Sequence, residues 1–377
     1  MPRKHRLVGG VESPQFRNNK ISFPGCSALS AVSITFYKTI TVASMKRKRS
    51  KTANLVQYIG LKTLVAFIRL IPLQIGVMVV KSLAHVFYLF DKKQRKIAYE
   101  NLRIAYGDGL SDFQMRQIIR STYLHFALVW IDFVKLPQIV STDNWQNYFE
   151  IEGLEFAHKA QEEGKGVIFV TGHVGNWEVL GYAFEFFFQP LNSIAKHLKN
   201  PFADRYLTRL REEGRQKIIF TENASRKIIR VLRDNKPLGI LVDQNARENN
   251  IFVDFFGQKA ATTRSVATIA LKTGSPIIMG FLRRTDKKYR FKVTLSEPIQ
   301  IERSGNLEKD ILSLTQRYTT LIESRIREYP HEWLWMHRRW KTKPPTTICS
   351  IKKKYLHGVC AGVSKSTTGI ADRTMHS

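Results

Sequence analysis

The string from Thr171 to Glu178, Thr-Gly-His-Val-Gly-Asn-Trp-Glu, combines residue types that can move a proton. In one unbroken helix, His173 and Glu178 would point ~140° apart and could not pair. Gly172 and Gly175 permit a non-helical turn, and we expect this turn to fold the imidazole back against the carboxylate. A carboxylate on one ring nitrogen fixes the tautomer, which leaves the other nitrogen free to take a proton from a hydroxyl.

The same residues also have an ordinary structural interpretation. A histidine at the end of a strand is more often a satisfied structural residue than a base, and Asn176 is a typical helix cap. A bare His-x4-Glu pattern occurs by chance in many proteins. The complete string is far more specific than this spacing, and we therefore predict His173 and Glu178 as catalytic residues, with Gly172, Gly175 and Asn176 shaping the turn.

The elements that must position this string alternate in type along the chain. Short apolar runs predict strands, and amphipathic stretches predict helices. The predicted strands are 166–171, 218–220, 238–243, 276–282 and 289–295, and the predicted helices are 178–188, 224–234, 265–272 and 306–328. This alternation predicts an α/β fold with a mostly parallel mixed sheet flanked by helices. Ligands of such sheets gather at the carboxyl ends of the strands, where the string lies.

Four segments of the chain differ in composition and in hydrophobic pattern. Residues 1–44 mix Pro, Gly, Ser and Asn without periodicity, which predicts a disordered extension; a secretory signal is the alternative, disfavoured by its short apolar patch 31–37. Residues 45–91 are apolar with basic interruptions, 92–345 carry the predicted catalytic domain, and 346–377 read as a disordered basic tail. Within the third segment, residues 92–136 read as helices, one opened by a capping box at Ser111.

The segment 45–91 predicts membrane association. Its longest uncharged stretch, Leu70–Val80, has 11 residues, whereas a spanning helix needs ~20 apolar residues. We therefore expect an interfacial helical segment whose lysines and arginines reach the head groups. The basic cluster Lys46–Arg49 favours an anchor on the cytoplasmic face. A helix pair packed into the core of a soluble protein is the alternative.

The chain is strongly basic, with 60 Lys+Arg against 31 Asp+Glu and a net charge of +29 over 377 residues. The segments 1–44 and 346–377 carry +5 and +4, which leaves +20 for residues 45–345. Such charge attracts nucleic acid, anionic lipid, phosphorylated substrates or acidic proteins. No helix-turn-helix, RNP-like string, zinc spacing, Walker A or dinucleotide glycine pattern accompanies it, which disfavours a nucleic-acid partner.

Three cysteines lie near the chain ends, at Cys26, Cys349 and Cys360. A disulfide scaffold is therefore excluded, as is a cysteine nucleophile or a thiolate metal site in the main body.

The Gly172–Glu178 string resembles the His-x4-Asp/Glu block of the glycerophospholipid-type acyltransferase superfamily. In its Gly-His-x-Gly-Asn-Trp-Glu form it is similar to the late acyltransferases of lipid A biosynthesis, the lauroyl and myristoyl transferases. Further similar blocks follow in the family's order, at 95–105, 199–204, 241–263 and 329–341. The resemblance spans roughly residues 50–345 and implies a glycerol-3-phosphate acyltransferase-like fold.

The resemblance implies transfer of a fatty acyl chain from acyl carrier protein to a hydroxyl of a Kdo-bearing lipid A precursor. In that reaction His173 takes the hydroxyl proton, while Glu178 orients the imidazole and stabilises its charge. No acyl-enzyme, metal or bound cofactor is required. The implied partners are acidic acyl carrier protein, a phosphorylated glucosamine-based lipid and membrane lipids, with the catalytic domain on the cytoplasmic face of the inner membrane.

The resemblance also implies substrate-binding residues. Lys196 stands where the family usually has an arginine before Asn-Pro, and a lysine lacks the bidentate fork of that arginine. Asp243 belongs to the third block, in which Asn245 replaces a frequent second acid; without the family, Asp243 reads equally well as a turn residue. Arg338 and Arg339, in the closing tryptophan-rich block, are predicted to face the substrate; a solvated basic strip or a core edge are the alternatives.

Other functions remain open from the sequence. An acyltransferase acting on another glycolipid, such as a phosphatidylinositol mannoside, shares these blocks. A glycerophospholipid acyltransferase would share the base but usually carries a Phe-Pro-Glu-Gly-type block, which is absent. A basic membrane-surface protein or a nucleic-acid-binding protein is the non-enzymatic alternative.

Overall fold

The computed structural model describes residues 50–222, 224–285 and 289–345. The predicted extensions 1–44 and 346–377 and the basic cluster 46–49 lie outside the described residues.

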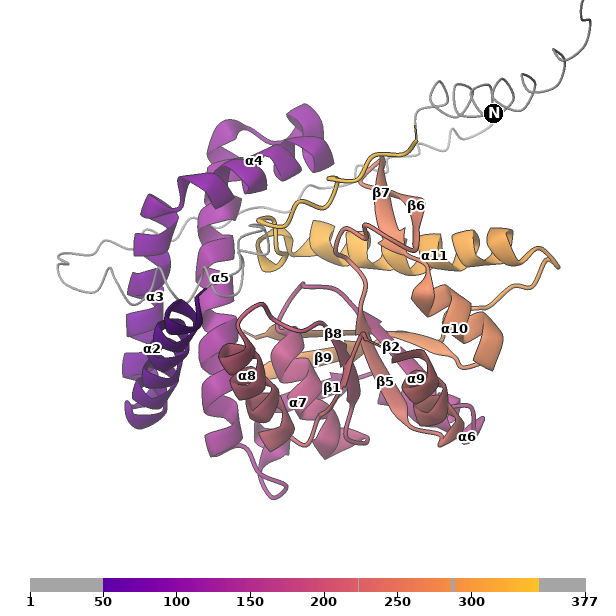
Figure 1. The fold of residues 1–377 in the computed structure, drawn as a ribbon, viewed down its shortest axis with the longest axis horizontal. Coiled ribbons are helices and arrows are strands. Elements are labelled where there is room, and N and C mark those ends of the chain that lie inside the picture. Colours follow the sequence, from indigo (N-terminus) through magenta and orange to yellow (C-terminus); the bar gives the residue numbers. More distant parts are fainter. Residues whose placement is uncertain (1–49, 223, 286–288, 346–377) are drawn as a thin grey trace, which may run out of the picture.

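A seven-stranded sheet in the order β1-β9-β8-β2-β5-β3-β4 forms the centre of the fold (Figure 1). Every neighbouring pair is parallel except β8 with β9, and the predicted mostly parallel mixed sheet is confirmed. The strands are β1 Phe149–Glu152, β2 Val167–Thr171, β3 Asn192–Ala195, β4 Lys217–Phe220, β5 Pro237–Leu241, β8 Ile277–Arg284 and β9 Phe291–Leu295. A separate antiparallel hairpin joins β6 Asn250–Phe255 to β7 Gln258–Thr263.

Helices cover both faces of this sheet, as predicted. The helices are α2 Lys51–Leu70, α3 Leu73–Phe90, α4 Lys92–Tyr106, α5 Asp112–Ile139, α6 Leu154–Glu162, α7 Trp177–Phe187, α8 Pro201–Glu213, α9 Ala224–Arg233, α10 Ser265–Thr273 and α11 Leu307–Glu328, with short 3₁₀ helices at Gly107–Gly109, Trp145–Asn147 and Pro330–Glu332. Strand β2 is buried along its whole length. Its residues Ile168 and Val170 face the core under α9, α10 and α11, while Val167 and Phe169 face the core under α6 and α7. Two-sided burial explains why this strand is continuously apolar.

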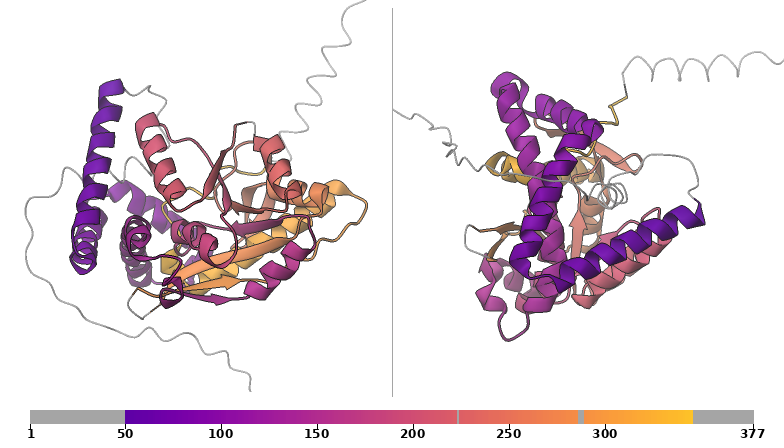
Figure 2. Two further views of the ribbon diagram at one scale, coloured as in Figure 1. Left: turned by 90° about the horizontal axis from the view of Figure 1, so that it is seen from below. Right: turned by 90° about the vertical axis from the view of Figure 1, so that its left-hand side faces the viewer.

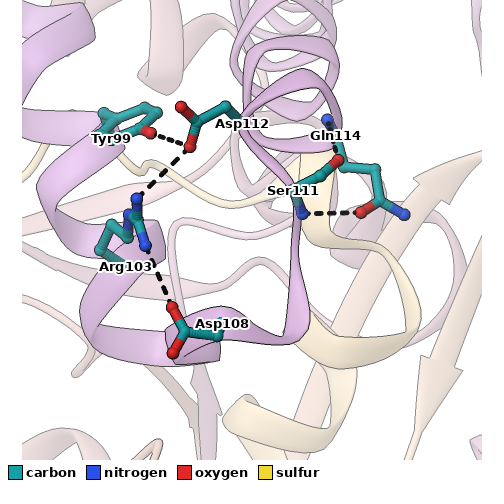
Figure 3. A network of polar contacts seen from close by, with 6 residues as sticks. All are labelled: Tyr99, Arg103, Asp108, Ser111, Asp112 and Gln114. Carbon is teal, nitrogen blue, oxygen red and sulfur yellow. Dashed lines mark hydrogen bonds and ion pairs between the residues drawn. The ribbon is translucent and has the colours of Figure 1, made fainter.

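The corner between α4 and α5 is fixed by polar contacts (Figure 3). Ser111 accepts a hydrogen bond from the Gln114 amide at 3.3 Å, and the Gln114 side chain accepts one from the Ser111 amide at 2.8 Å, so the predicted capping box forms. Arg103 pairs with Asp108 and Asp112, and the Tyr99 hydroxyl donates to Asp112. The corner orients α5, which packs against α2, α3 and α7.

Helices α2 and α3 form a layer at one side of the molecule, in front of the remaining chain in the right-hand view of Figure 2. The small α3 residues Gly76, Val80 and Ala84 are buried, and Gly76 lies against Ile131 of α5. The remainder of the layer exposes large apolar side chains at Leu55, Val56, Ile59, Phe67, Leu70, Ile75, Met78, Leu89 and Phe90.

Helix α3 has a mean hydropathy of 1.6 over its 18 residues, of which 17% are buried. By length and composition it is long and apolar enough to cross a membrane. The sequence-based count stopped at Lys81 and missed this, because the helix continues through a single lysine to Phe90.

Two strands of the main sheet and the hairpin were not predicted. Strands β1 and β3 have only four residues each, and β3 begins with the polar pair Asn192-Ser193. Four-residue runs interrupted by polar residues give too weak a pattern to predict a strand, and the place of β1 and β3 comes from pairing with β9 and with β4 and β5.

Candidate active site

His173 lies just beyond the carboxyl end of β2, beside Asp243 at the equivalent place after β5. Thr171 pairs with Leu241 in parallel register, so the residues two positions further on come side by side. The His173 Nδ1 atom is 2.8 Å from Asp243 Oδ1, and the His173 amide donates to Asp243 Oδ2 at 2.8 Å. Gly172 permits this approach, since a Cβ there would lie 3.1 Å from the Asp243 carboxyl carbon.

The Asp243 carboxylate is buried and fully engaged. Its side chain is 3% exposed, and Trp333 Nε1 donates a further hydrogen bond to Oδ2 at 2.8 Å. Burial alone would raise the pKa of Asp243, but the charge and hydrogen bonds of His173, together with the Trp333 bond, hold this pKa well below its usual range. Asp243 is therefore an anion that accepts the Nδ1 proton of His173.

The second ring nitrogen of His173 faces a cavity. Because Nδ1 donates to Asp243, Nε2 is the acceptor, and Gln244 Nε2 lies 3.2 Å from it. The cavity has a volume of about 550 Å³, within the usual range for small-molecule sites. Its wall is largely apolar, with Phe126, Trp130, Phe184 and Leu207, and its polar lining residues include His173, Glu178, Lys196, His197, Arg211, Gln244 and His337.

Glu178 does not contact His173. Both of its carboxylate oxygens accept from Arg211 of α8, with Nε at 3.0 Å and one terminal nitrogen at 2.6 Å. The Glu178 side chain is 6% exposed and that of Arg211 26%. Although burial opposes the Arg211 charge, Glu178 outweighs it and raises the pKa of Arg211. The predicted pairing of the histidine with Glu178 is thus corrected: Asp243 holds the imidazole, and Glu178 ties the first turn of α7 to α8.

The turn that carries His173 is fixed by two predicted residues. Gly175 has φ +66°, and a Cβ there would approach the Leu282 carbonyl oxygen to 2.2 Å, so a larger residue is excluded. The Asn176 side-chain oxygen caps α7 by accepting from the Val179 backbone amide at 3.1 Å. The Asn176 backbone N–H donates to the Leu282 carbonyl at 2.8 Å. His125 of α5 contacts the Gly175 carbonyl at 3.0 Å.

The closing block packs onto the same turn. Val174 and Trp333 form an antiparallel bridge, and the Leu334 amide donates to the His173 carbonyl at 3.2 Å. Next to this bridge, the buried Glu332 carboxylate has one oxygen without a hydrogen-bond partner, and Arg283 is 3.9 Å from the other. Burial raises the pKa of Glu332 to about 7.

The predicted substrate-binding residues separate into three groups. Lys196 is exposed and lines the cavity, while Arg338 is exposed. Asp243 lies behind His173, where no substrate can reach its carboxylate. The prediction that Arg339 faces the substrate is wrong. Arg339 is 0% exposed, and its guanidinium donates to the Ala261 and Gln244 carbonyls at 2.6 and 3.3 Å.

Arg339 is buried because backbone carbonyls and the Thr262 hydroxyl need its donors and because Phe255 lies under its guanidinium. By holding the Gln244 carbonyl, Arg339 supports the loop that places the Gln244 side chain over His173.

Three residues at the site, Arg211, Gln244 and Trp333, were not predicted as site residues. Arg211 is distant in sequence from His173 and carries no local signal, and Trp333 was noted only as part of the closing tryptophan-rich block. A signal that brings Asp243 near His173 was present, because His173 follows the predicted strand 166–171 by two residues and Asp243 is the last residue of the predicted strand 238–243. Among the residues that the structure describes, no group of three His, Cys, Asp or Glu side chains is placed to hold a metal ion.

Comparisons with known proteins agree with the geometry. The family model of the bacterial lipid A biosynthesis acyltransferases matches residues 42–342. A phosphatidylinositol mannoside acyltransferase of Mycolicibacterium smegmatis is 22% identical over 229 residues, which cover 59% of this chain and 72% of that protein. Two Escherichia coli proteins, a lipid A biosynthesis palmitoleoyltransferase and a lipid A biosynthesis lauroyltransferase, are 23% and 22% identical over 259 residues, 68% of this chain and 81% of each relative.

Proposed function

The chain belongs to the bacterial lipid A biosynthesis acyltransferase family, and on that premise we propose that it transfers a fatty acyl chain from acyl carrier protein to a hydroxyl of a Kdo-bearing lipid A precursor. One observation carries the proposal: His173 is held through Nδ1 by the buried Asp243 carboxylate and turns Nε2 toward a largely apolar cavity. This is the arrangement of a general base beside a site for an acyl chain.

The reaction is a direct transfer. Nε2 of His173 takes the proton of the acceptor hydroxyl as the oxygen attacks the thioester carbonyl, and Asp243 stabilises the imidazolium that forms. The tetrahedral intermediate collapses by breaking the carbon–sulfur bond, and the leaving thiolate takes the proton back from Nε2. The Gln244 amide yields its place on Nε2 to the hydroxyl and is then close enough to donate to the developing oxyanion.

Charges around the cavity serve the acceptor. Arg211 and Lys196 line the wall, and cations at this place suit the phosphates of a lipid A precursor. The Glu178 carboxylate keeps the Arg211 guanidinium in one orientation. The exposed apolar residues of α2 and α3 attach the enzyme to the cytoplasmic membrane, with the catalytic domain on the cytoplasmic face.

The test is a membrane-fraction assay with labelled acyl carrier protein and a Kdo-bearing tetra-acyl precursor. Wild type transfers the label, and His173→Ala lowers the rate by about 10²–10⁴-fold, the usual contribution of a general base. His158→Ala changes an exposed histidine of α6 outside the cavity lining; it is the matched control and retains full activity. A His173→Ala protein with undiminished transfer contradicts the mechanism.

A second acceptor is favoured by one observation, the 22% identity to a phosphatidylinositol mannoside acyltransferase, which matches the identity to the lipid A relatives. Both acceptors are therefore offered in parallel assays. Transfer to the mannoside alone replaces the lipid A proposal and leaves the base assignment intact.

A further inference from the structure

Helix α9 carries a stripe of four exposed cations: Arg226, Lys227, Arg230 and Arg233. The spacing of these residues places them on one helix face, which we name the α9 stripe. The opposite face, with Ala224, Ile228 and Leu232, is buried in the core. Within residues 50–222, 224–285 and 289–345, no acidic side chain forms an ion pair with any of the four. The stripe is therefore available to an external anionic partner.

The amino-terminal end of α9 lies close to the cavity that His173 lines. Thr221, three residues before α9 begins, lines the cavity of His173, and so does Ile218 of the adjoining strand β4. Lys196, at the end of the neighbouring strand β3, is exposed and lines the same cavity. A partner held on α9 would thus be close to the cavity that contains the Nε2 atom of His173.

The partner is an acidic protein rather than a lipid surface. A helix that binds a bilayer inserts apolar side chains beside its cations, and none of the exposed large hydrophobic residues lies on α9. Most of those residues, nine of 14, lie on α2 and α3, and Figure 1 and the left-hand view of Figure 2 place these two helices across α8 from α9. Membrane contact and the α9 stripe therefore occupy different parts of the molecule.

We propose that the α9 stripe is the docking surface for the acidic acyl carrier protein, which presents its thioester to the cavity from this side. The inference rests on the proposed function, since that function supplies the carrier-protein donor. Charge pairs at the edge of an interface act mainly on encounter rate and salt dependence. Losing the stripe should thus raise the KM for the donor and leave the chemical step unchanged.

The experiment compares two double charge reversals in detergent at saturating acceptor. Arg226→Glu/Arg230→Glu alters the stripe, and Arg116→Glu/Arg120→Glu on α5 is the matched control, since both arginines there are exposed with the same i, i+4 spacing. We expect the stripe variant to raise the KM for acyl carrier protein about tenfold or more with kcat within about twofold. The control keeps both constants, and a carrier protein with acidic residues changed to lysine restores the KM of the stripe variant.

Each contrary outcome has a distinct meaning. An unchanged KM in the stripe variant, or an equal rise in both reversals, overturns docking on α9 and leaves the proposed function standing. Loss of binding to vesicles of anionic lipid, with an unchanged donor KM, makes the stripe a membrane contact and likewise overturns the inference. Wild type that transfers from acyl-coenzyme A but not from acyl carrier protein overturns the proposed donor and the docking surface together.

Discussion

Two buried carboxylates lie near the cavity, Glu178 in its wall and Asp243 behind His173, and they have opposite kinds of partner. Asp243 accepts three hydrogen bonds, two from His173 and one from Trp333, and its neighbour is a side chain that can gain and lose a proton. Glu178 faces Arg211, whose charge is permanent. The first pair can therefore accept a proton during a reaction, whereas the second forms a fixed ion pair. The partner, rather than the spacing from His173, decides what each acid does.

The largest effect should come from removing the charge of Asp243. Asp243→Asn keeps the shape of the side chain but lets an amide donate to Nδ1, which moves the ring proton to Nε2 and removes the acceptor for the substrate hydroxyl. We expect kcat to fall by about 10²–10⁴-fold, measured by acyl transfer on protein whose melting profile matches wild type. An Asp243→Asn enzyme within tenfold of wild type would mean that this carboxylate does not set the tautomer.

Glu178→Gln tests the other half of the comparison. The variant leaves the Arg211 guanidinium facing a neutral amide. Breaking a buried ion pair in this way destabilises the fold, because one charge stays buried without its partner. We expect the free energy of unfolding to fall by about 1–3 kcal/mol, since part of Arg211 is exposed to solvent. The kcat per folded molecule should fall less than for Asp243→Asn. A stably folded Glu178→Gln enzyme as inactive as His173→Ala would return the catalytic partnership to Glu178.

The sequence was sufficient for the fold because its strands are buried on both faces. Continuous apolar runs such as Val167–Thr171 and Ile277–Leu282 are buried, and the helices between them keep a regular amphipathic period. The missed strands of the main sheet, β1 and β3, are short and take their conformation from neighbours in the sheet.

For the candidate site, the residue types were predictable and the pairings were not. His173, Gly172, Gly175 and Asn176 could be placed because they act within one turn. The partner of His173 depends on the register between β2 and β5, and the partner of Glu178 lies 33 positions away on α8. Arg339 shows the same limit, since its substrate-facing position was inferred from the family resemblance, whereas the structure buries it against backbone carbonyls.

Gln244→Ala should have a smaller effect than either acid variant. The Gln244 amide contacts Nε2 of His173 at 3.2 Å, so its removal frees the proposed base in the resting enzyme but also takes away the proposed donor for the oxyanion. We expect kcat to fall by about 10-fold or more with little change in the acceptor KM. Gln161→Ala is the control, because its amide caps no site residue and bonds to Asn235 instead. A change confined to the acceptor KM would assign Gln244 to binding alone.

The smallest effect concerns the third acid near the turn, Glu332, which sharpens the comparison through pH. Asp243 has a lowered pKa, so its contribution to stability is present above its unfolded value of 3.8 and is lost as the pH falls through its folded value. Glu332 behaves in the opposite sense. Burial raises its pKa from 4.5 to about 7, so its contribution is complete below pH 4.5 and is lost as the pH rises through 7.

As the pH rises from 4.5 to 8, the free energy of unfolding of Glu332→Gln should therefore increase relative to that of wild type, by about 2 kcal/mol or less. The reason is that a neutral amide has no charge to desolvate. The measurement is the unfolding midpoint in detergent at both pH values, with exposed Glu100→Gln of α4 as the control whose difference from wild type stays constant. If the stability difference between Glu332→Gln and wild type is also constant with pH, Arg283, whose Nε lies 3.9 Å from Glu332 Oε1, compensates the buried charge. Glu332 then forms a fixed ion pair, as Glu178 does. A difference that grows with pH keeps Glu332 apart from both acids, as a carboxyl group that the fold holds protonated beside the turn that carries His173.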